Sequence, residues 1–409
     1  MPDYGSTDLI SNSDHHPPFS VMLPVSIIGI GSLGTFFTSQ LRLIHPDLPI
    51  NLLLKSSTAL QTFHEPSASR PASSLLVRDL VGSPPIITSS FSATSLHPSS
   101  PSSITSAEDA PPIPILLSTL KCTKIVPTLK LLAPRLRSPS STIVLLHNGM
   151  GIYETLIRDV FPDRSSQPSF IIGTTSVGVR LDEPFGVTLS GLGQSTFALV
   201  PSENSTPRST STQKIGQEHE QDGDLSRMPS SSEQALKYLS SLTTHPNTHP
   251  VELTSYPTLL PQLLLKLCMN ALINPLTALH SVLNGQLITD PSFLPLLREL
   301  ISENSKVLTK AHPAYAALFT EEELTRRMWD LCERTKRNRS SMGQDIDRKR
   351  ETEIEFINGY ISMLGRTVDV KTPVNDRLVK EVLELSEHGQ SRDDIVLWDS
   401  IISRERLCP

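Results

Sequence analysis

The chain has 409 residues, enough for two domains with a sizeable core. Its formal net charge of −6 at pH 7 argues against a nucleic-acid partner, because such a partner normally requires a basic face. Hydrophobic residues make up only 37% and there are 34 prolines, so we expect part of the chain to lie outside any packed core.

Cysteine usage and the N-terminal composition favour a cytoplasmic protein. The cysteines are widely spaced and predict reduced thiols: Cys122, Cys268, Cys332 and Cys408. No Lys or Arg precedes Arg42, so neither a signal peptide nor a mitochondrial presequence is recognisable, although a mitochondrial location stays an alternative. No apolar run is long and uninterrupted enough to predict a membrane span, and no histidine spacing predicts a metal site.

A glycine motif follows the first apolar strand. Residues 1–20 carry little apolar pattern and predict a disordered leader. From Pro24 a short strand leads into G-x-G-x-x-G spacing and then a helical pattern, the motif being Gly29, Ile30, Gly31, Ser32, Leu33 and Gly34. Strand, glycines and helix in this order predict a site for the pyrophosphate of a dinucleotide. The alternative is a glycine-rich turn of any α/β protein.

A second apolar run, Ile50–Leu54, ends in Lys55. NAD-binding domains place an acidic residue here to bind the ribose hydroxyls, whereas a lysine suits a 2′-phosphate. The sequence therefore predicts a preference for NADP over NAD. The alternative is an ordinary surface lysine at the end of a strand.

The rest of residues 21–200 predicts a doubly wound sheet. Residues 83–113 are rich in Ser and Pro and predict a surface insertion in which only Ile86–Phe91 resembles a strand. Apolar strands then lead to Lys121 and, after Leu146, to Asn148, at the end of the strand where doubly wound sheets bind ligands. Two later segments predict antiparallel or edge strands, Phe170–Arg180 and Gly186–Ser190.

The second half of the chain predicts helices. Residues 201–250 read as a low-complexity insertion with one short helix, Ser232–Leu242. Residues 251–409 predict an all-helical domain, with helices over Leu263–Leu279, Pro291–His312, Glu321–Arg339, Met342–Leu364 and Asn375–Leu385. The expected fold class is α/β, a Rossmann-type doubly wound sheet domain followed by an all-helical C-terminal domain.

A polar stripe interrupts the most apolar of these helices. Lys266, Asn270 and Asn274 recur at four-residue intervals and so share one face. A lysine in so apolar a frame must face a cleft or a partner, unless the stripe simply faces water. Pro275 should kink or end the helix and free the Ala271 carbonyl beside the stripe.

Taken together, several motifs resemble the ketopantoate reductase family, the NADPH-dependent 2-dehydropantoate 2-reductases. The matching stretches are GIGSLG from Gly29, TLK ending at Lys121, LLHNGMG from Leu145, GTTSVG from Gly173, KLCMNALINPLTAL from Lys266, NGQL from Asn284 and SSMGQDIDRKRETEIEFINGY from Ser340. Their shared order is far more specific than the glycine motif alone.

The resemblance implies roles for individual residues. Lys266 matches the general acid, and Glu353, about three helical turns past Ser341, matches an acidic residue that meets substrate and cofactor. Asn148 matches the asparagine beside the nicotinamide. The substrate contacts implied are Lys266, Asn270, Asn274, Asn284 and Ser341, and the further cofactor contacts are Lys55, Lys121 and Val179. Lys55 stands where the family more often has arginine, which weakens a bidentate grip on phosphate.

The function expected is reduction of 2-dehydropantoate to (R)-pantoate with NADPH, a step towards pantothenate and coenzyme A. One alternative keeps the chemistry with another branched 2-oxo acid as substrate. A second alternative is a non-catalytic descendant that serves as a binding or regulatory module. We expect a small-molecule partner, no nucleic acid and no membrane, and the sequence leaves open whether the chain forms a homodimer.

Overall fold

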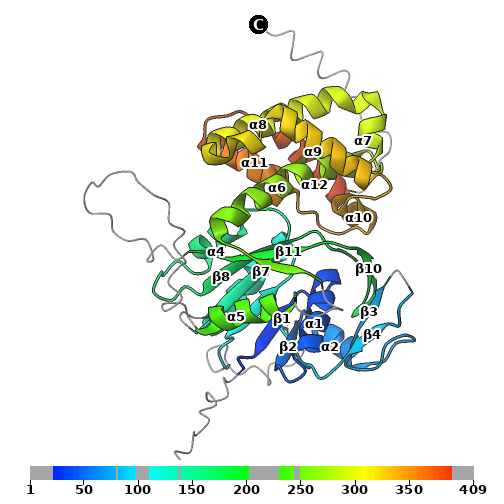
Figure 1. Ribbon diagram of the computed structural model, residues 1–409, viewed down its shortest axis with the longest axis vertical. Coiled ribbons are helices and arrows are strands. Elements are labelled where there is room, and N and C mark those ends of the chain that lie inside the picture. The colour runs from blue at the N-terminus through cyan, green and yellow to red at the C-terminus, as the bar shows by residue number, and fades with distance from the viewer. Residues whose placement is uncertain are drawn as a thin grey trace, which may run out of the picture.

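The computed structural model describes residues 22–79, 82–97, 110–136, 140–201, 230–243 and 249–388. The leader expected at residues 1–20 and most of the 201–250 insertion lie outside these ranges. The described chain forms an α/β region with a helical region above it (Figure 1). This arrangement confirms the predicted fold class.

An eight-stranded sheet forms the centre of the α/β region. The strands run in the order β12-β11-β8-β7-β6-β1-β2-β5, and all neighbours from β8 to β5 are parallel. Strand β11 is antiparallel to β8, as expected for a strand that closes the sheet. The bounds are β1 (Val25–Ile28), β2 (Ile50–Leu54), β5 (Ser92–Ser95), β6 (Ile115–Ser118), β7 (Thr142–Leu146), β8 (Ser169–Thr175), β11 (Ser195–Leu199) and β12 (Val251–Leu253).

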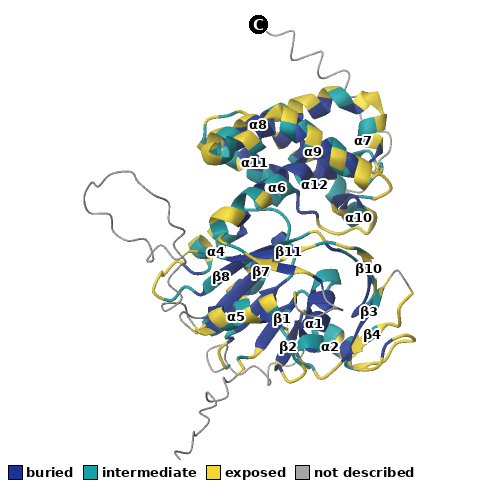
Figure 2. Ribbon diagram, in the orientation of Figure 1, coloured by how far each residue is buried: buried dark blue, intermediate teal, exposed yellow. Residues whose placement is uncertain are grey.

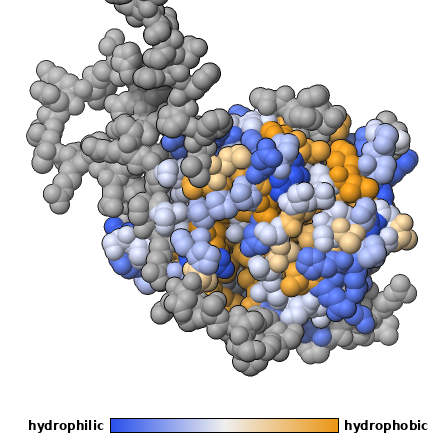
Figure 3. Space-filling model, turned by 90° about the horizontal axis from the view of Figure 1, so that it is seen from below, coloured by the Kyte–Doolittle hydropathy of each residue, from blue (hydrophilic) through white to orange (hydrophobic). Residues whose placement is uncertain are grey.

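Helices cover both faces of this sheet, which explains why its central strands are apolar throughout. One core cluster joins the sheet to α1 (Ser32–Ile44) and α5 (Ser230–Ser241). The other joins it to α3 (Cys122–Leu132) and α4 (Ile152–Asp159). Helix α2 (Ser57–His64) packs beside β5, and a 3₁₀ turn, η2, spans Ala133–Arg135. The central strands are buried (Figure 2), whereas apolar and polar side chains are interspersed over the face seen from below (Figure 3).

A second, four-stranded sheet packs against α1. Its order is β4-β3-β10-β9, with bounds β3 (Leu75–Asp79), β4 (Ile86–Thr88), β9 (Gly178–Glu183) and β10 (Gly186–Gly191). The prediction of a single strand over Phe170–Arg180 is therefore wrong, because this segment contains the end of β8 and the start of β9. The chain leaves the main sheet at Thr175 and enters the second sheet at Gly178, because Ser176 turns to donate its amide to Gln194 O at 2.9 Å.

Two predicted boundaries also need correction. Within the predicted 83–113 insertion, where only Ile86–Phe91 was expected to resemble a strand, Ser92–Ser95 is the edge strand of the main sheet and pairs with β2. Backbone pairing suffices for an exposed edge strand, so its serine-rich sequence gave no apolar signal. Likewise, Val251–Leu253 pairs with β11, and the helical region begins only at Tyr256.

The helical region packs around α6 (Tyr256–Leu279). The other helices are α7 (Gln286–Thr289), α8 (Leu294–Ala311), α9 (Glu321–Arg334), α10 (Ser341–Asp347), α11 (Ile354–Thr367) and α12 (Pro373–His388), with 3₁₀ turns η5 (Pro291–Phe293) and η6 (Pro313–Leu318). By length and composition α6 could cross a membrane, contrary to the sequence-based expectation. However, 61% of its most apolar window is buried in the protein, as in a core helix.

Several helix bounds differ from the prediction. α6 begins at Tyr256 and not at Leu263, Pro275 does not end it, and α9 stops at Arg334. The helix predicted over Met342–Leu364 is two helices, separated by a turn in which Arg350 donates its amide to Asp345 O at 2.8 Å. Residues 348–351 of this turn are charged and exposed, so no apolar face continues the helix. Glu353 is consequently the N-cap residue of α11, and not a position three helical turns past Ser341.

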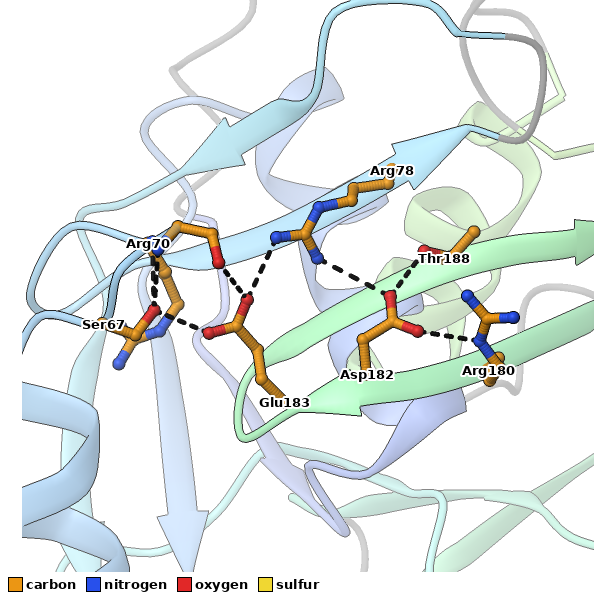
Figure 4. A network of polar contacts seen from close by, with 8 residues as sticks. Ser67, Arg70, Arg78, Arg180, Asp182, Glu183 and Thr188 are labelled. Carbon is orange, nitrogen blue, oxygen red and sulfur yellow. Dashed lines mark hydrogen bonds and ion pairs between the residues drawn. The ribbon is translucent and has the colours of Figure 1, made fainter.

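A network of polar contacts fastens the loop after α2 to the second sheet (Figure 4). Arg78 contacts Asp182 at 3.6 Å and Glu183 at 3.1 Å, and Glu183 also accepts hydrogen bonds from Ser67 and Ser69. Next to it Arg70, only 3% exposed, donates to the carbonyls of five residues: Thr62, Phe63, Glu65, Pro71 and Ser74. The guanidinium of Arg70 therefore organises this loop from inside.

We expect Arg70→Met to destabilise the protein by about 3 kcal/mol, because it leaves several carbonyls without a donor. Urea unfolding followed by circular dichroism measures this. Arg180→Met is the matched control, since the Arg180 side chain is 58% exposed, and its change should stay below about 0.5 kcal/mol. Equal losses in the two variants would contradict a special role of Arg70.

Candidate active site

The glycine motif forms the turn between β1 and α1. Gly29 has φ +89, and a Cβ there would lie 2.7 Å from the Leu120 amide nitrogen. A Cβ at Gly34 would overlap the Gly29 carbonyl, so this glycine allows helix and strand to pack closely. A Cβ at Gly31 would meet no atom nearer than 3.9 Å. The motif thus combines a left-handed turn, a tight helix–strand contact and an open position where a ligand can approach the backbone.

The start of α1 suits an anion. The helix begins at Ser32, has no acidic residue in its first turn, and has no side chain bonded to its free amides. Ile30 and Leu33 lie partly buried against the adjoining core. The parallel pairing of Ile28 with Leu53 places Lys55 across from this turn, at the same edge of the sheet and exposed. Glycine turn, helix start and lysine lie at the same edge of the sheet, an arrangement that suits a dinucleotide.

Lys266 extends from α6 of the helical region to the end of β8. Its Nζ donates a hydrogen bond to Thr175 O at 2.9 Å. Burial lowers the pKa of Lys266 to about 8, and the negative charge of Glu353 opposes this shift. The sequence-based expectation that this lysine faces a cleft or a partner, and not open water, agrees with this position.

Glu353 lies at the start of α11 and is 8% exposed. One carboxylate oxygen accepts the backbone amide of Cys122 at 3.0 Å, and the other accepts Asn148 Nδ2 at 3.3 Å. Cys122 follows β6 and Asn148 follows β7, so the carboxyl ends of adjacent parallel strands meet the helical region here. This is the edge at which open α/β sheets bind their ligands.

The structure brings some of the predicted substrate residues close to this point. Asn270 and the buried Asn274 lie on α6, one and two turns beyond Lys266. Helix α10 packs on α6, where Thr277 Oγ1 donates to Ser340 Oγ at 2.7 Å. Ser340, and not Ser341, is the N-cap of α10, and Ser341 is exposed beside it. The stripe and the start of α10 thus form one wall.

Two predicted site residues, Asn284 and Val179, make their contacts with other parts of the protein. Asn284 Nδ2 donates to Thr335 Oγ1 at 3.0 Å, while its buried Oδ1 has no partner among the described residues. Val179 lies in β9 opposite Leu189, partly buried against the core beside α1. Within the described ranges, neither shares a recorded hydrogen bond with Lys266 or Glu353.

Lys121 joins the two regions. Its Nζ forms an ion pair with Asp345 at 2.6 Å and donates to Glu351 O at 3.1 Å. Burial raises the pKa of the Asp345 carboxyl, although Lys121 counteracts this shift. A residue that the family resemblance assigns to the cofactor therefore also binds α10 of the helical region.

Sequence reasoning missed several groups around the site. Thr175 and Cys122 contribute backbone atoms, for which the sequence carries no side-chain signal. His147 lies within hydrogen-bond distance of the Asn148 carbonyl, with Nδ1 at 2.8 Å, and burial lowers the pKa of His147 to about 4. Asp345 stands inside the quoted SSMGQD motif, so that motif was the available signal.

We predict that Glu353→Gln lowers the pKa of Lys266 below about 8, because Glu353 is the group that raises it. The pH dependence of Lys266 acylation by a small anhydride, followed by peptide mass spectrometry, measures this pKa without any turnover. Glu351→Gln is the control, since Glu351 pairs with the exposed Lys124. An unchanged Lys266 pKa in Glu353→Gln would refute the proposed coupling.

Comparison with known proteins identifies the family of the chain. Residues 25–202 match the family described as ketopantoate reductase PanE/ApbA, and residues 258–386 match its C-terminal region. A probable 2-dehydropantoate 2-reductase of Schizosaccharomyces pombe is 29% identical over 262 residues, 62% of this chain and 69% of the relative. The Vibrio cholerae 2-dehydropantoate 2-reductase is 36% identical over 122 residues, which cover 30% of this chain and only 40% of that relative.

Solved structures share the fold at low identity. A probable 2-dehydropantoate 2-reductase from Bacillus subtilis gives a TM-score of 0.58 at 23% identity, covering 89% of this chain and 100% of that one. A ternary structure of D-mandelate dehydrogenase with NADH and anilino(oxo)acetate gives 0.64 at 18% identity, covering 89% and 98%. With both regions matched in order and the fold shared throughout, the chain belongs to the ketopantoate reductase family.

Proposed function

We propose that this chain is an NADPH-dependent oxidoreductase that reduces the ketone of 2-dehydropantoate to the alcohol of (R)-pantoate. The observation that carries the proposal is the meeting of Lys266, Glu353 and Asn148 at the carboxyl edge of the sheet that holds the glycine turn. A cation beside a carbonyl that gains negative charge can stabilise and protonate it. Membership of the family supports this choice of reaction.

The α/β region supplies the cofactor site in this proposal. The turn Gly29–Gly34 and the free amides of α1 bind the pyrophosphate, and Lys55 binds the 2′-phosphate. Lys121, Val179 and Asn148 are the further contacts, with Asn148 beside the nicotinamide. Bound NADPH supplies the hydride, whereas the protein's residues hold and orient the cofactor.

Lys266 is the proton donor in this proposal. With its pKa lowered to about 8, the ammonium is mostly protonated at neutral pH, yet it releases its proton more readily than an exposed lysine. Glu353 attracts the ammonium and is itself held by Cys122 and Asn148. These contacts position the acid before any substrate arrives.

The helical region supplies the substrate contacts. The amides of Asn270 and Asn274 line the same face of α6 as Lys266, and Ser341 lies at the adjacent start of α10. We assign these groups, together with Asn284, to the carboxylate and hydroxyl oxygens of the substrate. Amides and hydroxyls suit this role because they bind oxygen atoms without adding a charge to the site.

A reductase of another branched 2-oxo acid uses the same groups and differs only in the apolar wall of the site. The D-mandelate dehydrogenase structure with NADH and anilino(oxo)acetate shares the fold, so NADH and a second 2-oxo acid belong in the assay. Faster turnover of that second acid would replace the proposed substrate. Absence of turnover with every acid, despite NADPH binding, would favour a non-catalytic binding module.

We expect Lys266→Ala to lower kcat with 2-dehydropantoate by about 10²- to 10⁴-fold, because the proton donor is lost. The decrease in NADPH absorbance measures this, and NADPH affinity from fluorescence titration should change little. Lys124→Ala is the control, because that lysine is 54% exposed and pairs with Glu351 outside the site. Full activity of Lys266→Ala would exclude Lys266 as the acid.

The pH dependence of kcat follows from the same assignment. Below about pH 8 Lys266 carries the proton that it must donate, and above that value it does not. Reduction should therefore slow as pH rises through about 8. A rate measured from pH 6 to 10 that increases throughout this range would contradict a protonated lysine as the acid.

Lys55→Glu should reverse the cofactor preference. Replacing a cation by an anion repels the 2′-phosphate of NADPH, whereas an acidic residue at this position can bind the ribose hydroxyls of NADH. The ratio of kcat/KM for NADPH to that for NADH should fall by at least about tenfold. Lys130→Glu, at an exposed position of α3, is the charge-matched control, and an equal change in both variants would contradict a specific contact.

A further inference from the structure

A proline inside α6 leaves one buried carbonyl without its helical partner. Pro275 has no amide hydrogen, so the carbonyl of Ala271, four residues earlier, cannot accept the usual bond although the helix continues to Leu279. Ala271 is fully buried, and an unpaired carbonyl there would be costly. Asn358 of α11 supplies the missing donor, with Nδ2 at 3.1 Å from the Ala271 oxygen.

The Asn358 side chain is itself held firmly. It is fully buried, and its Nδ2 also donates to Asn375 Oδ1 at 3.0 Å. Asn375 in turn donates to Glu303 at 2.8 Å and to Asn304 at 2.9 Å. The amide can take only this orientation, because the reverse would place its oxygen against the Ala271 carbonyl. A buried polar network thus connects α6 to α11, α12 and α8 at one point.

The bond between Asn358 and Ala271 lies close to the groups assigned to the reaction. Asn358 is five residues beyond Glu353, and Ala271 is five residues beyond Lys266. Along each helix this spacing is about 7.5 Å. Lys266 and Glu353 lie on the same side of the bond, since Glu353 contacts Asn148 at the end of β7 and Lys266 contacts Thr175 at the end of the adjacent β8. A slip of one helix along the other would therefore change the separation of these two groups.

We propose that Asn358 is a positioning residue, whose hydrogen bond to the Ala271 carbonyl sets α11 against α6 and so holds Glu353 in place beside Lys266. This proposal rests on the proposed function for its consequence in catalysis. The geometric part of the proposal does not depend on the proposed function, because it concerns only the placement of Glu353 relative to Lys266. Asn358 itself touches neither substrate nor cofactor in this account.

The pKa of Lys266 reports this placement directly. The charged or titratable groups that act on Lys266 are Glu353 at the start of α11 and His147 after β7. His147 is neutral near pH 8, because burial lowers its pKa to about 4. Asp345, at the same boundary, is paired with Lys121. Movement of Glu353 away from Lys266 should therefore lower the pKa of Lys266 further.

The first variant is Asn358→Leu, which keeps the branched shape of the side chain and removes the donor. We expect a lower Lys266 pKa by the acylation measurement, and a kcat lower by about 10- to 100-fold with NADPH affinity nearly unchanged. Asn304→Leu is the matched control, because it removes a fully buried asparagine of the same network that has no bond to Ala271. That control should leave the Lys266 pKa and kcat close to those of the native protein.

A second variant separates positioning from stability. Pro275→Ala returns a backbone amide at position 275, so the Ala271 carbonyl regains a helical donor. Combined with Asn358→Leu, it should recover part of the lost unfolding free energy in urea. The hydrogen bond from position 358 of α11 to the Ala271 carbonyl of α6 stays absent, so the Lys266 pKa and kcat should remain low. Pro275→Ala alone should have a Lys266 pKa and a kcat close to those of the native protein.

The outcomes decide between the two roles. If the double variant recovers the native Lys266 pKa and kcat together with stability, or if Asn358→Leu leaves the Lys266 pKa unchanged, the positioning role is overturned. If the native protein fails to oxidise NADPH with any 2-oxo acid, the proposed function fails instead. The acylation measurement still tests the positioning of Glu353 in that case, because it needs no turnover.

Discussion

The buried carboxylate of Glu353 connects the two regions of this protein. It comes from the helical region, yet both of its oxygens bind groups at the ends of β6 and β7: the amide of Cys122 and the side chain of Asn148. A carboxylate removed from water needs hydrogen-bond donors. The contact between the two regions supplies these donors to Glu353. Lys266 makes the converse contact, a cation of the helical region bound to the carbonyl of Thr175. These two contacts place the boundary of the regions at the carboxyl edge of the sheet.

Opposite charges lie near one another at this boundary. Lys266 and Glu353 are the more buried, and burial and the charge of Glu353 act in opposite directions on the pKa of the lysine. Lys121 and Asp345 form an ion pair at 2.6 Å, closer to the solvent. Oppositely charged partners permit burial of this many ionisable groups, because each unpaired charge would be costly in a low-dielectric surrounding. The neutral His147 adds a polar contact to Asn148 without adding charge.

The rest of the fold supports this boundary from both sides. Below it, the second sheet encloses α1, and the Arg70 and Arg78 contacts hold the preceding loop to that sheet. Above it, α6 is surrounded by the helices of its region, and the chain of bonds from Glu303 through Asn375 to Asn358 fixes their relative placement. Buried polar bonds of this kind require one particular packing, because a shifted helix would leave several groups unpaired.

The sequence alone determined the local features: the strand–turn–helix around Gly29 to Gly34, the polar stripe from Lys266 to Asn274, and the carbonyl of Ala271 left free by Pro275. These features depend on residues within about one or two turns of each other, which periodicity and backbone chemistry reveal. Only the tertiary structure decided that Ser92–Ser95 joins the main sheet, that the Glu353 carboxylate binds Cys122 and Asn148, and that Asn358 donates to the free carbonyl. Glu353 and Cys122 are 231 residues apart, and no local pattern encodes a contact over that distance. Such partners are selected by the packing of whole elements, where most buried donors and acceptors must be satisfied at once.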